Sequence, residues 1–309
     1  MKHLRQSVRI SALVFIAFLL WVTQVLLAPS VSRALPIETD TALTVGFESN
    51  VVRSFARVIR KSSLLQDGDE ISDPEDREVT VYSTPLVIPL RISPNFVITG
   101  IFPILVIDEE RTVLGQRVEN SSSGIGDLQF SVKHAFYRKD ALKRTTRLAW
   151  TAGIKLPTGD ETETPALGSG SVDYMIGGIL THIVDRFAVH ADLKYKVNTE
   201  ANGVRAGNTL KHDLAFEYRV WPARFQSMSD KTYNLILELN GNYAESSNNG
   251  GSTVANTGGE TLFLSPGIQL VATPRLIIEA LFQYPIVQEL RGTQPGVDYT
   301  ASLGFRYSF

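Results

Sequence analysis

The sequence predicts an all-β protein: a closed antiparallel transmembrane β-barrel of about twelve strands that follows a cleaved signal peptide. Three observations indicate this class. An apolar leader opens the chain, polar and apolar residues alternate in most later segments, and the chain ends on an aromatic residue. Residues 298–309 (DYTASLGFRYSF) alternate without a break, over a length that suits a tilted membrane-crossing strand.

The last strand also carries a targeting signal. Phe305, Tyr307 and the terminal Phe309 lie on one face of it. This ending resembles the C-terminal signal of bacterial outer-membrane barrels, which the barrel-assembly machinery reads. We therefore expect localisation in the outer membrane of a Gram-negative cell, with that machinery, outer-membrane lipid and lipopolysaccharide as partners.

Composition excludes several other classes of protein. The chain has 309 residues, 30 Lys and Arg against 32 Asp and Glu, and no Cys. This balance argues against binding to nucleic acid, which needs a basic surface. The absence of Cys excludes disulfides and thiolate metal sites, and we expect no cofactor.

The N-terminus predicts export. An apolar run at 10–28 follows four basic residues, Lys2, His3, Arg5 and Arg9. Ser32 and Ala34 are small residues at the −3 and −1 positions for cleavage after Ala34. We therefore expect a signal peptide at 1–34 and a single outer-membrane barrel domain at 35–309. Because the apolar run is long, an uncleaved membrane anchor is the alternative.

Twelve segments have strand character. In 188–197, for example, Val189, Leu193 and Tyr195 alternate with Asp192 and Lys194. The expected strands are 41–49, 79–90, 96–107, 128–137, 146–156, 171–184, 188–197, 210–220, 233–243, 260–272, 276–285 and 298–309. An even number of strands places both termini of the chain on the periplasmic side. Pro85, Pro89 and Pro103 conflict with the second and third strands unless bulges accommodate them.

A soluble β-sandwich also alternates, but three features favour a barrel in lipid. Nearly every strand has one charged and one apolar face, and aromatic residues such as Trp150, Tyr195 and Tyr243 lie near strand ends. Connection lengths also alternate between short turns and long polar loops. The expected outer loops are 50–78, 108–124, 157–170, 198–208, 244–259 and 286–297.

The face opposite the apolar one should line the lumen. Basic residues predominate on its earlier strands and acidic residues on its later ones. The predicted lumen-lining residues, which are the candidates for transport, are Lys133, Arg147, Lys155, Lys194, Lys196, Lys211, Arg219, Glu238, Glu260, Glu279, Asp298 and Arg306. These charges either pair and fill the lumen or border a narrow wet path, and twelve strands allow both.

A series of motifs lies on this pattern. Residues 124–128 read GIGDL, 153–160 read GIKLPTGD and 167–171 read LGSGS, followed by Asp173. The series resembles the outer-membrane family associated with the meta-pathway of phenol degradation, whose members are usually described as transporters. That family offers no agreed binding or catalytic residues to carry over. Gly, Asp and Pro at strand ends also suit tight turns and bulges, and Lys155 is the motif residue with a candidate role in function.

Candidates for other chemistry are weaker. His134, His182 and His212 fall on the outward face, where an outer-membrane lipid hydrolase would need a Ser partner, and the G-x-S-x-G pattern is absent. The acidic run at 67–76 does not match a calcium-binding loop, so we expect no metal site. Arg53, Arg57, Arg60 and Lys61 in the expected first outer loop could contact lipopolysaccharide phosphates.

The sequence therefore predicts a non-enzymatic, channel-like outer-membrane protein for passive transport of small molecules. Aromatic or apolar compounds are the solutes that the family resemblance implies. Two alternatives stay open. One is a structural or adhesive barrel whose long outer loops bind lipopolysaccharide or a partner, and the other is an outer-membrane lipid hydrolase.

Overall fold

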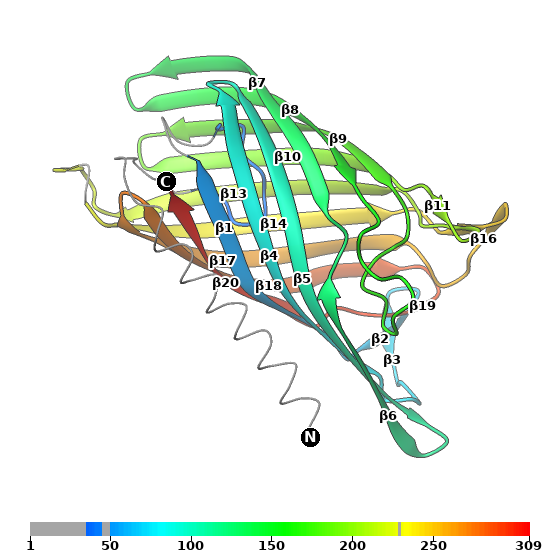
Figure 1. Ribbon diagram of the computed structural model, residues 1–309. Coiled ribbons are helices and arrows are strands. Elements are labelled where there is room, and N and C mark those ends of the chain that lie inside the picture. The colour runs from blue at the N-terminus through cyan, green and yellow to red at the C-terminus, as the bar shows by residue number, and fades with distance from the viewer. Residues whose placement is uncertain (1–34, 45–49, 228–229) are drawn as a thin grey trace.

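The computed structural model describes residues 35–44, 50–227 and 230–309, and these form a closed antiparallel β-barrel (Figure 1). The main sheet has thirteen strands, of which β6 (Gln116–Ile125) pairs only with β5. The other twelve close the wall: β1 (Val51–Lys61), β4 (Glu78–Ser93), β5 (Phe96–Val113), β7 (Gln129–Ala141), β8 (Arg144–Lys155), β9 (Asp173–Val184), β10 (Phe187–Val197), β13 (Thr209–Trp221), β14 (Thr232–Ala244), β17 (Gly259–Thr273), β18 (Leu276–Leu290) and β20 (Tyr299–Ser308). The predicted fold class is confirmed, whereas the expected signal peptide lies outside the described residues.

The first and last wall strands close the ring. β1 pairs with β20 over ten residue pairs, from Val51 opposite Ser308 to Arg60 opposite Tyr299. The two ends are joined by reciprocal backbone hydrogen bonds of 3.0 Å between Asn50 and Phe309. Closure leaves no strand edge facing lipid, where unpaired backbone groups could not be hydrated.

The prediction of the first strand is wrong in position, although the total of twelve is confirmed. The expected strand at 41–49 is not a wall strand: 41–44 has no strand structure, and 45–49 lies outside the described residues. The wall begins instead at β1, inside the segment expected to be the first outer loop. That loop is shortened to 62–77, where β2 (Leu64–Gln66) and β3 (Asp69–Ile71) form a small sheet with β19 (Thr293–Pro295).

The three conflicting prolines lie inside continuous strands without a bulge at any of them. Pro85 and Pro103 face each other across β4 and β5. Pro85 falls in a gap of the β1–β4 ladder, and Pro89 lies beyond the end of that ladder. Pro103 lies where β5 changes partner from β7 to β6. Each proline therefore sits where a neighbouring ladder is interrupted, which removes the cost of its missing N–H.

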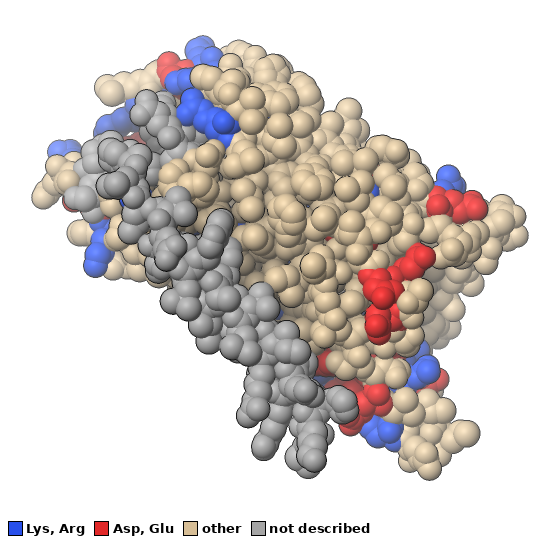
Figure 2. Space-filling model, viewed as in Figure 1, with Lys and Arg blue, Asp and Glu red and all other residues tan. Residues whose placement is uncertain are grey.

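The outside of the barrel is apolar. Exposed Leu, Ile, Val and aromatic side chains occur on nearly every wall strand, and the predicted outward aromatics Trp150, Tyr195 and Tyr243 are among them. In the view of Figure 2, an uncharged band separates charged groups that gather toward the two ends. This is the surface that a transmembrane barrel presents to lipid. In the described part of the chain, no helix is long and apolar enough to cross a membrane.

The two ends of the barrel differ. At the end that holds Phe309, most adjacent strands are joined by turns of two residues, as at 94–95, 185–186 and 274–275. At the other end, longer loops carry a second small sheet of β11 (Glu200–Ala201), β12 (Val204–Arg205), β15 (Asn248–Asn249) and β16 (Ser252–Thr253). Short turns and long loops identify the periplasmic and outer ends respectively.

Closure of the wall depends on a glycine. Phe55 on β1 is buried in the lumen opposite Gly304 on β20, and a Cβ at Gly304 would overlap its ring and the carbonyl of Ser54. We expect Gly304→Ala to lower the free energy of unfolding by about 1–3 kcal/mol through overpacking. Gly178→Ala is the control, because a Cβ there meets no atom within 4 Å. Urea unfolding followed by tryptophan fluorescence measures both, and equal midpoints would contradict the prediction.

Candidate functional site: the barrel lumen

The lumen has two chemically different walls. Residues directly opposite each other in an antiparallel pair share a face, and Arg57 on β1 reaches into the lumen. Arg57 is opposite Ser83, which is opposite Leu105, so these positions on β4 and β5 also face inward. The same parity turns a further set of apolar side chains into the lumen: Val79, Val81, Pro85, Val87, Val97, Ile101, Pro103 and Ile107. We call β4 and β5 the apolar wall.

Strands β8 to β20 supply the opposite, polar wall. Its inward side chains include the buried residues His190, Asp192, Asp213, Glu217, Glu238, Asn240, Ser265, Gln269, Glu279, Gln283 and Arg306. Many are joined in a ladder. Ser265 donates to the Asn240 side-chain oxygen at 2.7 Å, and Gln283 donates to the same oxygen at 3.2 Å. Buried polar groups of this density require such partners, because an unpaired one is costly.

Residues 35–44 cross the lumen and are bound by the polar wall. The carboxylate of Glu238, which is fully buried, accepts hydrogen bonds from three consecutive backbone N–H groups. These are Ile37 at 2.6 Å, Glu38 at 3.2 Å and Thr39 at 2.7 Å, and the Thr39 hydroxyl adds a fourth at 2.7 Å. We call residues 35–44 the lumen segment.

Asp40 binds the lumen segment to the neighbouring strands. Its carboxylate lies 3.0 Å from the Lys133 ammonium and 3.3 Å from that of Lys194, and its backbone N–H donates to Asp192 at 2.6 Å. Burial alone would raise the pKa of Asp40, but the two ammonium groups outweigh it and hold that pKa well below its usual range. Asp40 is therefore ionised and paired at neutral pH.

Arginines hold the beginning of the lumen segment. Arg306 donates to the carbonyls of Leu35 and Pro36, and Arg53 donates to that of Ile37 at 2.7 Å. Both guanidinium groups also bind Glu279, at 2.9 Å and 2.7 Å. One buried carboxylate thus positions the two arginines that bind the segment.

Apolar contacts complete the packing of the lumen segment. Ile37 packs with Phe55, Ile236 and Leu281, and Ala42 packs with Ala135, Ala149 and Ile179. The Thr41 hydroxyl lies 3.0 Å from that of Thr181, which also accepts from the Ala42 N–H at 2.9 Å. The lumen segment therefore lies along the polar wall. The inward side chains of β4 and β5, on the other side of the lumen, are mainly apolar.

The structure places most predicted lumen residues inside the barrel. Lys133, Lys194, Glu238, Glu279 and Arg306 meet at the lumen segment, whereas Lys211 pairs with Asp213 at 2.9 Å. Arg147 is buried on β8, and Lys196 is half-buried on β10 near the outer end. Arg219 lies at the periplasmic mouth with its guanidinium over Phe225.

Two predicted lumen residues lie elsewhere. Glu260 is opposite Tyr243, whose side chain faces outward, so Glu260 is exposed outside the lumen and its prediction is wrong. β17 pairs with β14 without a register shift, so Glu260 shares the outward face of the exposed Leu264 and Ile268. Asp298 precedes β20 at the outer mouth, where it accepts from the Ser62 N–H at 2.7 Å.

The motif residues form an ion network at the outer end. Asp127 lies 2.8 Å from the Lys155 ammonium and accepts from the N–H groups of Gly159, at 3.1 Å, and Ser169, at 3.0 Å. Lys155 also lies 2.9 Å from Asp173. Burial raises the pKa of Asp127, but Lys155 and these donors outweigh it and lower that pKa. The motifs therefore tie the start of β7, the end of β8 and the loop 156–172 together.

The other candidate residues fall outside the lumen path. His134 stacks edge-on against Trp150 on the outer face, and the His182 Nδ1 lies 2.8 Å from the Thr146 hydroxyl. Arg53 and Arg57 face the lumen, so the prediction that they contact lipopolysaccharide from an outer loop is wrong. Within the described residues, no group of His, Asp and Glu could hold a metal ion.

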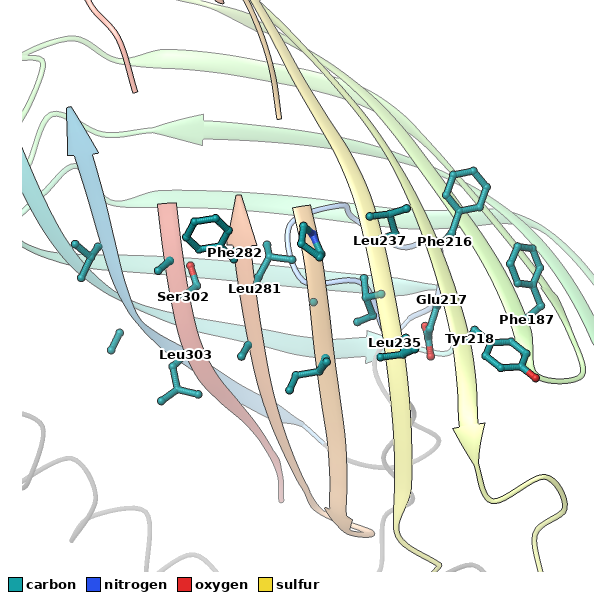
Figure 3. Close-up of a pocket in the computed structure, with 18 residues that line it drawn as sticks. Phe187, Phe216, Glu217, Tyr218, Leu235, Leu237, Leu281, Phe282, Ser302 and Leu303 are labelled. Atoms are coloured by element: carbon teal, nitrogen blue, oxygen red, sulfur yellow. The ribbon is translucent and has the colours of Figure 1, made fainter. Parts of the chain in front are cut away.

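The lipid-facing side has one large depression, of about 810 Å³, shown in Figure 3. It crosses strands from β10 to β1. It is lined by small residues such as Gly267, Ala280 and Ala301 and by larger ones such as Phe216 and Phe282. The lining is almost entirely hydrocarbon and suits the acyl chains of the surrounding lipid.

The family described as "Putative MetA-pathway of phenol degradation" matches residues 78–309, which includes the whole motif network. The chain belongs to this family. The match begins at β4, so it leaves out the lumen segment and β1. No curated protein matches the chain.

A solved structure has the same barrel architecture as this protein. An outer-membrane channel from Pseudomonas putida F1 has a TM-score of 0.69 at 13% identity, over 90% of this chain and 100% of that chain. The porin NanC (0.44, 13%, 84% and 100%) and the β domain of the Bordetella autotransporter BrkA (0.43, 9%, 84% and 99%) are less similar. The likeness to the Pseudomonas putida channel, at 13% identity, establishes the fold alone.

Sequence reasoning missed the lumen segment and the inward arginines of β1. Residues 41–49 alternate as a strand would, and 50–61 carry three arginines that suit a polar loop. No local pattern marked them, since the sequence already offered cations on the strands next to Glu238 and Glu279, as Lys211 and Arg306. Buried carboxylates require donors, and β1 and the segment supply them.

Replacement of Glu238 by Gln should loosen the lumen segment. The amide keeps one acceptor oxygen and turns an NH₂ group toward backbone donors, and a hydrogen bond to a charged group contributes about 1.5–3 kcal/mol. We expect hydrogen exchange of the Ile37–Thr39 amides to accelerate at least about tenfold, measured by mass spectrometry. Glu260→Gln, an exposed site, should leave the exchange unchanged. Equal exchange rates of the Ile37–Thr39 amides in the two variants would contradict the role of Glu238 in holding the lumen segment.

Replacement of Asp127 by Asn should release loop 156–172. The variant removes the charge that pairs with Lys155 and weakens the acceptor for Gly159 and Ser169. We expect protease cleavage within the loop to accelerate about tenfold, from a loss of about 1.5 kcal/mol. Asp160→Asn is the control, because Asp160 is exposed and its carboxylate accepts hydrogen bonds from the N–H and hydroxyl of Thr162 in the same turn. Resistance equal to that of the control would contradict a structural role of the network.

Proposed function

We propose that the protein is an outer-membrane channel for passive movement of small molecules, and that apolar or aromatic compounds move along the apolar wall. One observation carries this proposal. Among the described residues, the hydrogen bonds and ion pairs of the lumen segment go to the polar wall, to β1 and β7, and, from the Thr44 hydroxyl, to the Pro94 carbonyl in the β4–β5 turn. None of these goes to an inward side chain of β4 or β5, so that these side chains can meet a solute.

The exposure of the apolar wall supports this route. Ile101, Leu105 and Ile107 are half-buried although they point inward, whereas Glu238 and Glu279 on the opposite wall are fully buried. Half-buried hydrocarbon inside a barrel favours an apolar solute, because contact removes that surface from water. Polar solutes gain little there, since the charged groups opposite already bind the lumen segment and each other.

The alternatives have less support. An adhesive barrel that binds lipopolysaccharide through Arg53 and Arg57 conflicts with their inward direction, although the outer loops themselves stay candidates for binding a partner. A lipid hydrolase would need a Ser beside an outward His. His134 meets Trp150 instead, and His182 meets Thr146.

The route is tested by uptake of an apolar aromatic probe. We expect cells that produce the protein to take up 1-N-phenylnaphthylamine faster than cells without it, as followed by its fluorescence. Ile101→Asn, which puts an amide on the apolar wall, should reduce the initial rate several-fold, because the probe then displaces hydration without an apolar partner.

Thr99→Asn is the matched control, on the same strand and face but already polar. Its rate should equal that of the unaltered protein at equal amounts of folded barrel. Equal rates for Ile101→Asn and Thr99→Asn would exclude the apolar wall as the route. Absence of probe uptake by the folded native barrel would favour the adhesive alternative.

A further inference from the structure

Charge is distributed unevenly between the two ends of the barrel. The periplasmic connections, taken together with some adjoining strand ends as 91–95, 138–144, 185–186, 219–227, 230–231 and 274–275, contain ten Lys or Arg and three Asp or Glu. The outer connections, taken likewise with the β5–β6 hairpin as 62–77, 108–128, 156–172, 198–208, 245–258 and 291–298, contain five Lys or Arg and seventeen Asp or Glu. Figure 2 shows blue groups mainly at the end with short turns and red groups mainly at the other. We call the first set of connections the periplasmic rim.

The basic residues of the periplasmic rim lie at the depth of lipid headgroups. Exposed Tyr137 and Lys139, two residues later, share the outward face of β7, opposite Leu148 and Thr146. Arg186 lies 4.7 Å from the centre of the exposed Tyr218 ring. Exposed aromatic residues mark the boundary between hydrocarbon and headgroups, so the cations beside them on the same face lie near the phosphates.

Several of these cations are available for a ligand. Arg138 pairs with Asp140, and Lys143 lies 3.6 Å from Asp185. Among the described residues, by contrast, four exposed cations of the rim have no ion pair: Lys139, Arg144, Arg224 and Lys231. Lys139 and Arg144 lie at the adjoining ends of β7 and β8, and Arg224 and Lys231 lie in the β13–β14 loop.

We propose that the periplasmic rim binds the phosphates of anionic phospholipids in the periplasmic leaflet of the outer membrane. Apolar side chains between the cations favour a lipid surface over a soluble acidic protein. Leu142 is 94% exposed between Lys139 and Lys143, and Phe225 is 55% exposed beside Arg224. Cations next to exposed apolar groups, continuous with a lipid-facing belt, match an anionic membrane interface.

The test uses Trp221, which is exposed on the rim and faces outward against Tyr233. In the Trp21→Phe, Trp150→Phe background, the purified barrel is reconstituted with brominated phosphatidylglycerol or brominated phosphatidylcholine, and quenching of Trp221 gives their relative affinity. We expect about a fivefold preference for phosphatidylglycerol at low salt. The preference should fall toward one in 0.5 M NaCl, where the screening length is short.

Two quadruple variants decide the origin of the preference. The variant K139Q, R144Q, R224Q, K231Q should lose it, whereas the charge-conserving variant K139R, R144K, R224K, K231R should retain it. If the native protein shows no preference, or the neutralised variant retains it, the proposal is overturned. Binding of an oligoglutamate peptide by a native protein without lipid preference would then assign the rim to an acidic protein partner.

Discussion

Every backbone polar group in the hydrocarbon must be paired within the barrel, and this constraint determines which residues become strands. The pairing of β1 with β20 closes the wall and uses residues 51–61. The lumen segment is then left inside the barrel with no strand beside it. Its backbone groups still require partners, and side chains provide them: Glu238 binds its N–H groups, whereas Arg53 and Arg306 bind its carbonyls.

The same requirement for partners governs the charges of the lumen. Opposed basic and acidic walls would be expensive if they faced each other across a dry interior. Instead, Asp40 joins Lys133 on β7 to Lys194 on β10, and Glu279 joins Arg53 on β1 to Arg306 on β20. The charges are neutralised in local groups, and these groups hold the segment. The polar wall is therefore the fixed side of the lumen, and the apolar wall is the side left for a solute.

Most wall strands could be predicted because strict alternation over ten or more residues is typical of a β-strand with two different faces. Residues 188–197 and 298–309 matched β10 and β20 for this reason. The first wall strand was harder to locate from the sequence, because polar and apolar residues alternate in 41–49 as they do in a strand. Local pattern cannot distinguish a strand from an extended segment inside the barrel, because only long-range partners such as Thr181 for Ala42 differ. The prediction for Glu260 failed for another reason: it was assigned to the lumen because it is charged, whereas the unbroken alternation of β17 places it outside with Leu264 and Ile268.

The motifs show the reverse case, in which a local interpretation was right but incomplete. Gly159 and Gly168 allow two parts of the loop backbone to approach closely. A Cβ at Gly159 would overlap the backbone at Leu167 and Gly168, and a Cβ at Gly168 would overlap the backbone of Gly159. Turn chemistry accounts for that. It does not account for Lys155, whose two carboxylate partners lie 28 and 18 residues away along the chain. Asp127 and Lys155 become neighbours only through the pairing of Gln129 with Lys155 at the start of β7.

The charges at the two ends also bear on the solute that we propose. The outer end is acidic and the periplasmic rim is basic, so a cation is attracted at the first and repelled at the second, and an anion meets the reverse order. Either ion therefore faces one unfavourable mouth, within a screening length of about 8 Å at physiological salt. A neutral molecule feels neither field. Along the apolar wall it gains contact with Ile101, Leu105 and Ile107, which argues that the charge pattern and the wall favour the same class of compound.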